Sequence, residues 1–157
     1  MRPDDWKLPW LGGCRCGRVR LRVTEAPLCT FACHCTGCQR MTASAYSLTI
    51  MLPRTGLSVI EGETVIGGIH GPTRHHHCDH CKAWLFTYPE GADATTNLRA
   101  SALDDHLWVV PFVEVLTREG YPWAKTGARY SYPDNPRDEP FEPILADFAA
   151  TSPRPGS

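Results

Sequence analysis

The stretch CHCTGC, residues 33–38, contains three cysteines within six positions. Two further cysteine motifs flank it along the chain, CRC at residues 14–16 and CDHC at residues 78–81. Cysteines at such short spacings can direct two sulfurs to one metal ion, and two pairs from distant parts of a chain make a closed tetrahedral zinc site. The three motifs therefore predict a fold that is pinned by zinc.

Length and composition indicate one globular domain. The chain has 157 residues, of which 42% are hydrophobic and 21% are charged. We expect a single zinc domain over residues 1–150 and a flexible tail over residues 151–157, because TSPRPGS offers little to bury. The formal net charge of -1 gives no basic field that would attract a phosphate backbone, so we expect no nucleic-acid partner.

The sequence shows no export signal and no membrane span. The stretch MRPDDWKLPWLGG carries acids and prolines where a signal sequence needs an apolar run. The longest apolar stretch, residues 107–116, is interrupted by Pro111 and Glu114. We therefore expect no membrane partner and a cytoplasmic location, where reducing conditions favour metal binding by the cysteines over disulfides.

Short alternating runs between turn-forming residues predict an all-β domain of short antiparallel sheets with little helix. In VRLRV, residues 19–23, apolar side chains alternate with arginines, as expected of a strand with one buried face. Helical turns are expected only in GCQRMTA and PILADFAA. The other strand-like runs lie at residues 28–35, 44–52, 57–62, 64–70, 84–88, 97–101 and 107–116.

Seven of the eight cysteines divide into a group of four and a group of three. Cys29 is expected to be a buried apolar residue, since it would lie roughly 13 Å from Cys33 in an extended strand. A structural zinc takes four ligands, whereas three ligands with an open position are typical of a catalytic zinc. Because Cys33, Cys35 and Cys38 are local enough to hold one ion, we assign them to the second site. The remaining cysteines are assigned to the first site: Cys14, Cys16, Cys78 and Cys81.

We expect the CRC motif in an extended strand. There Cys14 and Cys16 point to the same face and can lean toward a shared ion. Gly17 then gives the backbone the freedom to turn away.

Two other assignments are open at this point. The CxxC pairs at residues 35–38 and 78–81 can form one zinc ribbon, which leaves Cys14, Cys16 and Cys33 over. Alternatively, a histidine closes the three-cysteine site and makes it structural. The nearby histidines are otherwise expected to be spectators or partners of a thiolate: His34, His75, His76, His77 and His80.

The three motifs, in this order, resemble the glutathione-dependent formaldehyde-activating enzyme family, also called the centromere-protein-V-like family. The similar stretches are GGCRCGRVRLRV, CHCTGCQRMTASAY, CDHCKAWLF, NLRA and LWV, between residues 12 and 112. The resemblance implies an Mss4-like β-tent. It also implies a structural zinc on the group of four cysteines and a catalytic zinc on the group of three.

The function that the resemblance implies is a zinc-dependent carbon-sulfur lyase reaction on a thiol-aldehyde adduct, as in S-(hydroxymethyl)glutathione synthase. The expected partner is a small thiol such as glutathione. A zinc with an open position lowers the pKa of a bound thiol or polarises an aldehyde. Three cysteinate ligands make that zinc less electrophilic, so we expect partial occupancy of the second site. The alternative function is a non-catalytic, zinc-stabilised protein-binding module.

The chain departs from the family pattern at two glycines. Lys82 follows Cys81, and Ala43 stands between Thr42 and Ser44. Losing a glycine restricts the turn. Arg40 and Lys82 are the cations nearest the motifs. Two roles are open for them: they bind the carboxylates of glutathione, or they are ordinary solvated surface residues.

Overall fold

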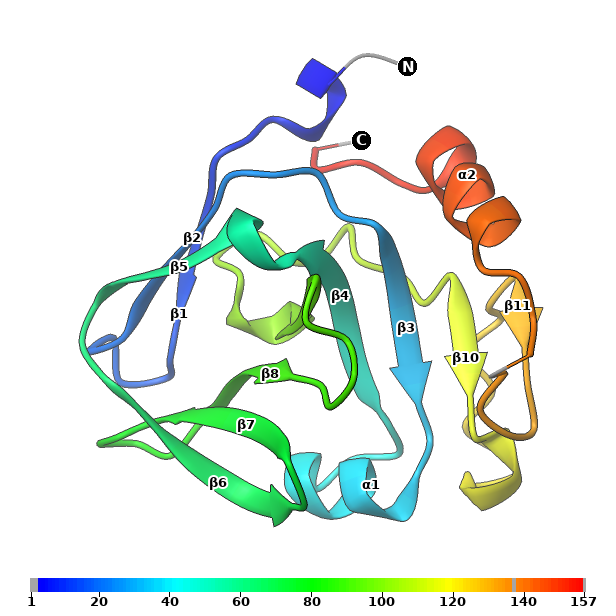
Figure 1. Ribbon diagram of the computed structural model, residues 1–157, viewed down its shortest axis with the longest axis horizontal. Helices are drawn as coiled ribbons and strands as arrows, with labels where there is room; N and C mark the ends of the chain where they lie inside the picture. Colours follow the sequence, from blue (N-terminus) through cyan, green and yellow to red (C-terminus); the bar gives the residue numbers. More distant parts are fainter. Residues whose placement is uncertain (1–2, 137, 157) are drawn as a thin grey trace.

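The computed structural model describes residues 3–136 and 138–156, and its strands form two sheets (Figure 1). The predicted fold class, mostly β sheets with little helix, is confirmed. The smaller sheet has the order β1-β2-β5 and is antiparallel. Its strands are β1 (Trp10–Gly13), β2 (Arg20–Val23) and β5 (Leu57–Glu61).

The larger sheet has eight strands in the order β11-β10-β3-β4-β9-β8-β7-β6. Its pairings are antiparallel except at β10, which runs parallel to both β3 and β11. Residues 116–129 connect β10 to β11 and are long enough for the crossover that parallel neighbours require. The expectation of purely antiparallel sheets is therefore wrong at this edge. The strands are β3 (Cys29–Cys33), β4 (Ser47–Pro53), β6 (Thr64–His70), β7 (Thr73–Cys78), β8 (Trp84–Tyr88), β9 (Thr95–Arg99), β10 (Val113–Val115) and β11 (Tyr130–Ser131).

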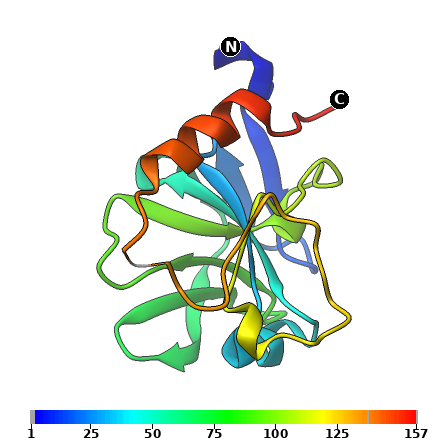
Figure 2. The ribbon, with the colours of Figure 1, turned by 90° about the vertical axis from the view of Figure 1, so that its right-hand side faces the viewer.

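Two α-helices occur in the described residues, α1 (Thr36–Thr42) and α2 (Glu142–Thr151), at the two places where helical turns were expected. Helix α1 lies at one end of β3 and β4, beside the β6–β7 hairpin (Figure 1). Figure 2 shows α2 crossing the opposite end of the molecule. Short 3-10 segments complete the chain: η1 (Pro3–Trp6), η2 (Arg54–Gly56), η3 (Ala100–Ala102) and η4 (Thr117–Glu119).

The apolar residues of the alternating stretch at residues 19–23 lie in the core, as predicted. Val19, Leu21 and Val23 have no exposed surface, while Arg18 and Arg22 are exposed. Cys29 is also fully buried, as expected of an apolar residue. Within residues 3–136 and 138–156, no helix has the length and apolarity needed to cross a membrane.

Helix α2 belongs to the same core. Phe148 is 1% exposed and stacks on Trp6, with ring centroids 5.9 Å apart. Beyond the helix, the guanidinium carbon of Arg154 lies 3.7 Å from the centroid of the Trp6 ring. That residues 151–157 are flexible stays a prediction. The last residue of this segment lies outside the described part of the chain.

Two local expectations are wrong. The CRC motif forms a turn between β1 and β2, in which the Gly17 N–H donates to the carbonyl oxygen of Cys14 at 3.2 Å. Gly17 has φ +80°, the left-handed region that glycine adopts without strain. The second error concerns β7, because residues 73–78 were not among the expected strands.

Candidate metal centres

Four cysteine sulfurs meet between the β1–β2 turn and the end of β7. We call Cys14, Cys16, Cys78 and Cys81 the four-cysteine cluster, and its sulfurs all lie within 4.8 Å of one another. The sulfur of Cys16 is 3.4 Å from that of Cys14 and 3.8 Å from that of Cys78. Ligands about 2.3 Å from a tetrahedral zinc are separated by about 3.8 Å, so this donor set fits a closed zinc site.

The surroundings of Cys14 in the four-cysteine cluster favour its thiolate. The Val19 N–H donates to the Cys14 sulfur at 3.3 Å, and the Cys81 N–H donates to the Cys78 sulfur at 3.4 Å. Burial of Cys14 opposes its ionisation. The Val19 amide and the neighbouring thiols outweigh burial and lower the pKa of Cys14 to about 6. The thiolate is the form that binds metal.

Three further sulfurs meet where β3 leads into α1. We call Cys33, Cys35 and Cys38 the three-cysteine cluster, and its sulfurs also lie within 4.8 Å of one another. Cys35 is the residue before α1, and its sulfur accepts from the Cys38 N–H at 3.3 Å. Hydrogen bonds from Cys33 and Cys38 lower the pKa of Cys35 to about 2. The Ser47 hydroxyl donates to the Cys38 sulfur at 3.1 Å.

The structure thus brings the seven cysteines together in groups of four and three. Cys35 and Cys38 group with Cys33 and do not meet the CxxC pair at residues 78–81, as a zinc ribbon would require. In the described part of the chain, no histidine nitrogen joins the three-cysteine cluster. The chain therefore offers an ion there three sulfurs and leaves one coordination position for another molecule.

His34 lies apart from its flanking cysteines. It is 2% exposed, and its Nε2 is 3.0 Å from Oε2 of Glu114 on β10. Glu114 also accepts hydrogen bonds from Thr126 and Ser131, both at 2.8 Å. This network ties the loop that carries the three-cysteine cluster to the neighbouring strand.

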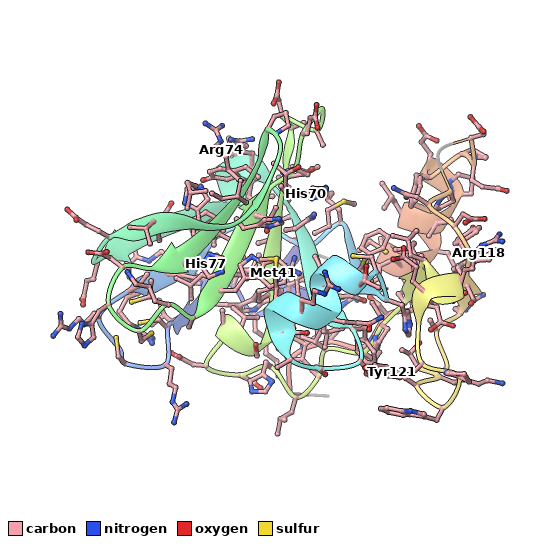
Figure 3. All side chains as sticks on the ribbon, turned by 90° about the horizontal axis from the view of Figure 1, so that it is seen from below. Met41, His70, Arg74, His77, Arg118 and Tyr121 are labelled. Atoms are coloured by element: carbon pink, nitrogen blue, oxygen red, sulfur yellow. The ribbon has the colours of Figure 1, made fainter. Side chains whose placement is uncertain are left out.

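A cavity of about 540 Å³ adjoins the three-cysteine cluster. We call it the thiol cavity; its walls come from α1 and the β6–β7 hairpin, and they include Cys35, Cys38, Met41, Gly68, His70 and His75. Figure 3 shows Met41 on α1 facing the hairpin strands, with His70 nearby. Helix and hairpin approach so closely that a Cβ on Gly68 would come within 2.5 Å of the Met41 methyl carbon.

His75 is the histidine that the thiol cavity and the core share. It is 8% exposed, and a hydrogen bond of 2.8 Å joins its Nδ1 to the Thr87 hydroxyl. Burial lowers the pKa of His75 to about 4, so the ring is neutral at pH 7. Spacing alone does not separate this residue from the other histidines of the run.

Arg40 and Lys82, which were weighed as partners for the carboxylates of glutathione, are both exposed. Arg40 lines the thiol cavity, while Lys82 forms an ion pair of 3.3 Å with Asp79. The positions where the family pattern has glycine are left-handed, with φ +50° at Ala43 and +62° at Lys82. The backbone therefore keeps the left-handed conformation that glycine favours, although alanine and lysine adopt this conformation less readily than glycine.

A mostly β fold with one four-cysteine and one three-cysteine cluster defines a class of cysteine-rich proteins equipped to bind metal. The family profile described as glutathione-dependent formaldehyde-activating enzyme matches residues 10–119, and the chain belongs to this family. The match contains all seven clustered cysteines and ends before α2.

Among solved structures, the chain is similar to a Rhodobacter sphaeroides protein determined by a structural genomics consortium. The TM-score is 0.51 at 19% sequence identity, over 60% of this chain and 87% of that chain. At this identity the likeness supports the fold alone. No curated protein matches the chain.

Proposed function

We propose that this protein is a zinc-dependent enzyme of the carbon-sulfur lyase type that acts on a thiol-aldehyde adduct, as S-(hydroxymethyl)glutathione synthase does. The observation that carries the proposal is the three-cysteine cluster, which offers three donors and opens on the thiol cavity. Family membership supports a reaction of formaldehyde with glutathione. We place this reaction in the cytoplasm.

In this proposal, Cys33, Cys35 and Cys38 hold the catalytic zinc and the four-cysteine cluster holds the structural one. When bound, a zinc with an open position supplies Lewis acidity and stabilises a thiolate. The second ion is held less tightly, because three residues bind it instead of four.

The chemistry needs no oxidant or reductant. A sulfur-carbon bond forms between the thiol and the aldehyde carbon while the carbonyl double bond becomes a single bond. The thiol proton ends on the former carbonyl oxygen, and the lyase direction reverses each change. The task of the protein is to position the thiol sulfur and the carbonyl group together.

The thiol cavity suits such a small reaction. Met41 and the backbone of the β6–β7 hairpin approach each other closely and narrow the space beside the cluster. The ring of His75 is neutral and is held in place by its hydrogen bond with Thr87. It therefore brings no positive charge that would compete with a metal ion for the thiolate.

Exchange NMR on an equilibrium mixture of formaldehyde and glutathione tests the proposal. We expect the zinc-loaded protein to accelerate interconversion above the unaided rate, and Cys35→Ala to lose that acceleration while staying folded. Cys29→Ala is the matched control, because Cys29 is a buried cysteine in neither cluster. Unchanged rates with zinc-loaded wild-type protein would reject the reaction and favour a zinc-stabilised binding module.

A further inference from the structure

Arg99, the last residue of β9, is a buried cation that forms no ion pair with a carboxylate in the described part of the chain. It is 6% exposed, and its Nη2 donates to the Asn97 carbonyl oxygen at 3.4 Å. Its Nε is buried and has no acceptor within the described residues. Burial lowers the pKa of Arg99 only to about 10, so the side chain stays charged at pH 7. Buried charges are normally paired, which makes this arrangement a sign of a missing ligand.

The side chain lines a cavity of about 860 Å³, which we call the arginine cavity. Its walls include Tyr46, Leu48, Trp84, Arg99, Ser101 and His106, and none of its lining residues is acidic. The guanidinium carbon of Arg99 lies 4.1 Å from the centroid of the Trp84 ring. Stacking on an aromatic face restrains a guanidinium while its N–H donors remain directed outward in the plane. Such a restrained fork suits a carboxylate.

The arginine cavity adjoins the region of the three-cysteine cluster. Met41 lines both this cavity and the thiol cavity. The charges of Cys38 and Cys33 also act on Arg99 and oppose the lowering of its pKa. The two cavities therefore share Met41 as a common wall.

We propose that Arg99 binds a carboxylate of the thiol substrate, so that the protein selects acidic thiols over neutral ones. The inference rests on the proposed function, because it places the thiol sulfur at the three-cysteine cluster. It assigns the anchoring role to a buried arginine that stacks on Trp84, in place of the exposed Arg40 or Lys82.

Calorimetric titration with S-methylglutathione tests this assignment without turnover. The methyl group blocks the thiol, and both carboxylates remain. We expect Arg99→Gln to bind it about 10- to 100-fold more weakly than wild type, the loss typical of a charged hydrogen-bonding partner. Arg99→Lys should lie between the two, because lysine keeps the charge and loses the planar fork. The exposed Arg22→Gln is the matched control and should bind like wild type.

The diethyl ester of S-methylglutathione provides the second arm. We expect wild type and Arg99→Gln to bind the ester equally weakly, since it lacks the carboxylates. Wild-type protein that binds acid and ester alike, or binds neither, would overturn the proposal. It would also be overturned if Arg99→Gln released zinc and kept its affinity for the acid, since Arg99 would then be the counter-ion of the thiolates. If only the proposed reaction is wrong, the exchange NMR rates will be unchanged by the protein, while the calorimetric difference between wild type and Arg99→Gln will remain.

Discussion

At the scale of single residues, one sulfur of the three-cysteine cluster receives a side-chain hydrogen bond from a neighbouring strand. Cys33 pairs with Ser47 across β3 and β4, and that pairing brings the Ser47 hydroxyl to the Cys38 sulfur. The cysteine spacing predicted the clustered residues, but it did not separate His75 from the neighbouring histidines and gave no sign of Ser47 or Arg99. These three lie on strands that sheet pairing brings to the site, so only the fold reveals them.

Ser47→Ala removes the hydroxyl that supports the Cys38 thiolate. We expect the zinc affinity of the three-cysteine cluster to fall about 10- to 100-fold, as is typical when a partner of a metal ligand is lost. Competition with a chromogenic chelator measures this affinity. The exposed Ser58→Ala is the matched control. Equal zinc affinity in Ser47→Ala and wild type would contradict the supporting role.

The buried His75 predicts a pH dependence of stability. Its pKa is about 4 in the folded protein against 6.5 for a free histidine, so the unfolded chain takes up the proton first as the pH falls. The free energy of unfolding should therefore decrease from about pH 6.5 down to about pH 4. Urea denaturation across this range should show a weaker decrease in His75→Gln than in wild type. The exposed His80→Gln should follow wild type, and identical curves for all three proteins would reject this role.

At the scale of helices and strands, the sequence was most informative where apolar and polar residues alternate. Strand β2 follows that pattern, whereas three of the six residues of β7 are histidines, which the pattern counts as polar. The structure stabilises β7 by pairing it on both sides and by stacking His76 on Phe86, with ring centroids 4.5 Å apart. Cross-strand stacking of this kind depends on register, which composition does not specify.

Helix α2 lies outside the residues matched by the family profile, yet its buried face belongs to the core. Phe148→Ala would leave a cavity against Trp6 and Phe112. We expect it to lower the free energy of unfolding by about 3–5 kcal/mol. Urea denaturation monitored by tryptophan fluorescence measures this loss. Leu107→Ala, at an 88% exposed residue, should change little, and equal losses in the two variants would contradict the packing of α2.

Over the whole molecule, two sheets converge on cysteines that lie far apart in the sequence. The four-cysteine cluster joins the β1–β2 turn of the small sheet to β7 of the large one, so an ion there would link the two sheets. The three-cysteine cluster is local to β3 and α1 and needs no such link. Under the proposed function, we therefore expect the metal of the four-cysteine cluster to stabilise the fold and that of the three-cysteine cluster to serve the reaction.

Counting zinc ions per chain by native mass spectrometry tests this division most directly. We expect two ions in wild type and one in a folded Cys35→Ala. Cys78→Ala should fail to fold, because binding of a structural zinc is itself a source of folding free energy. A Cys35→Ala chain that unfolds, or that retains as many ions as wild type, would contradict the account.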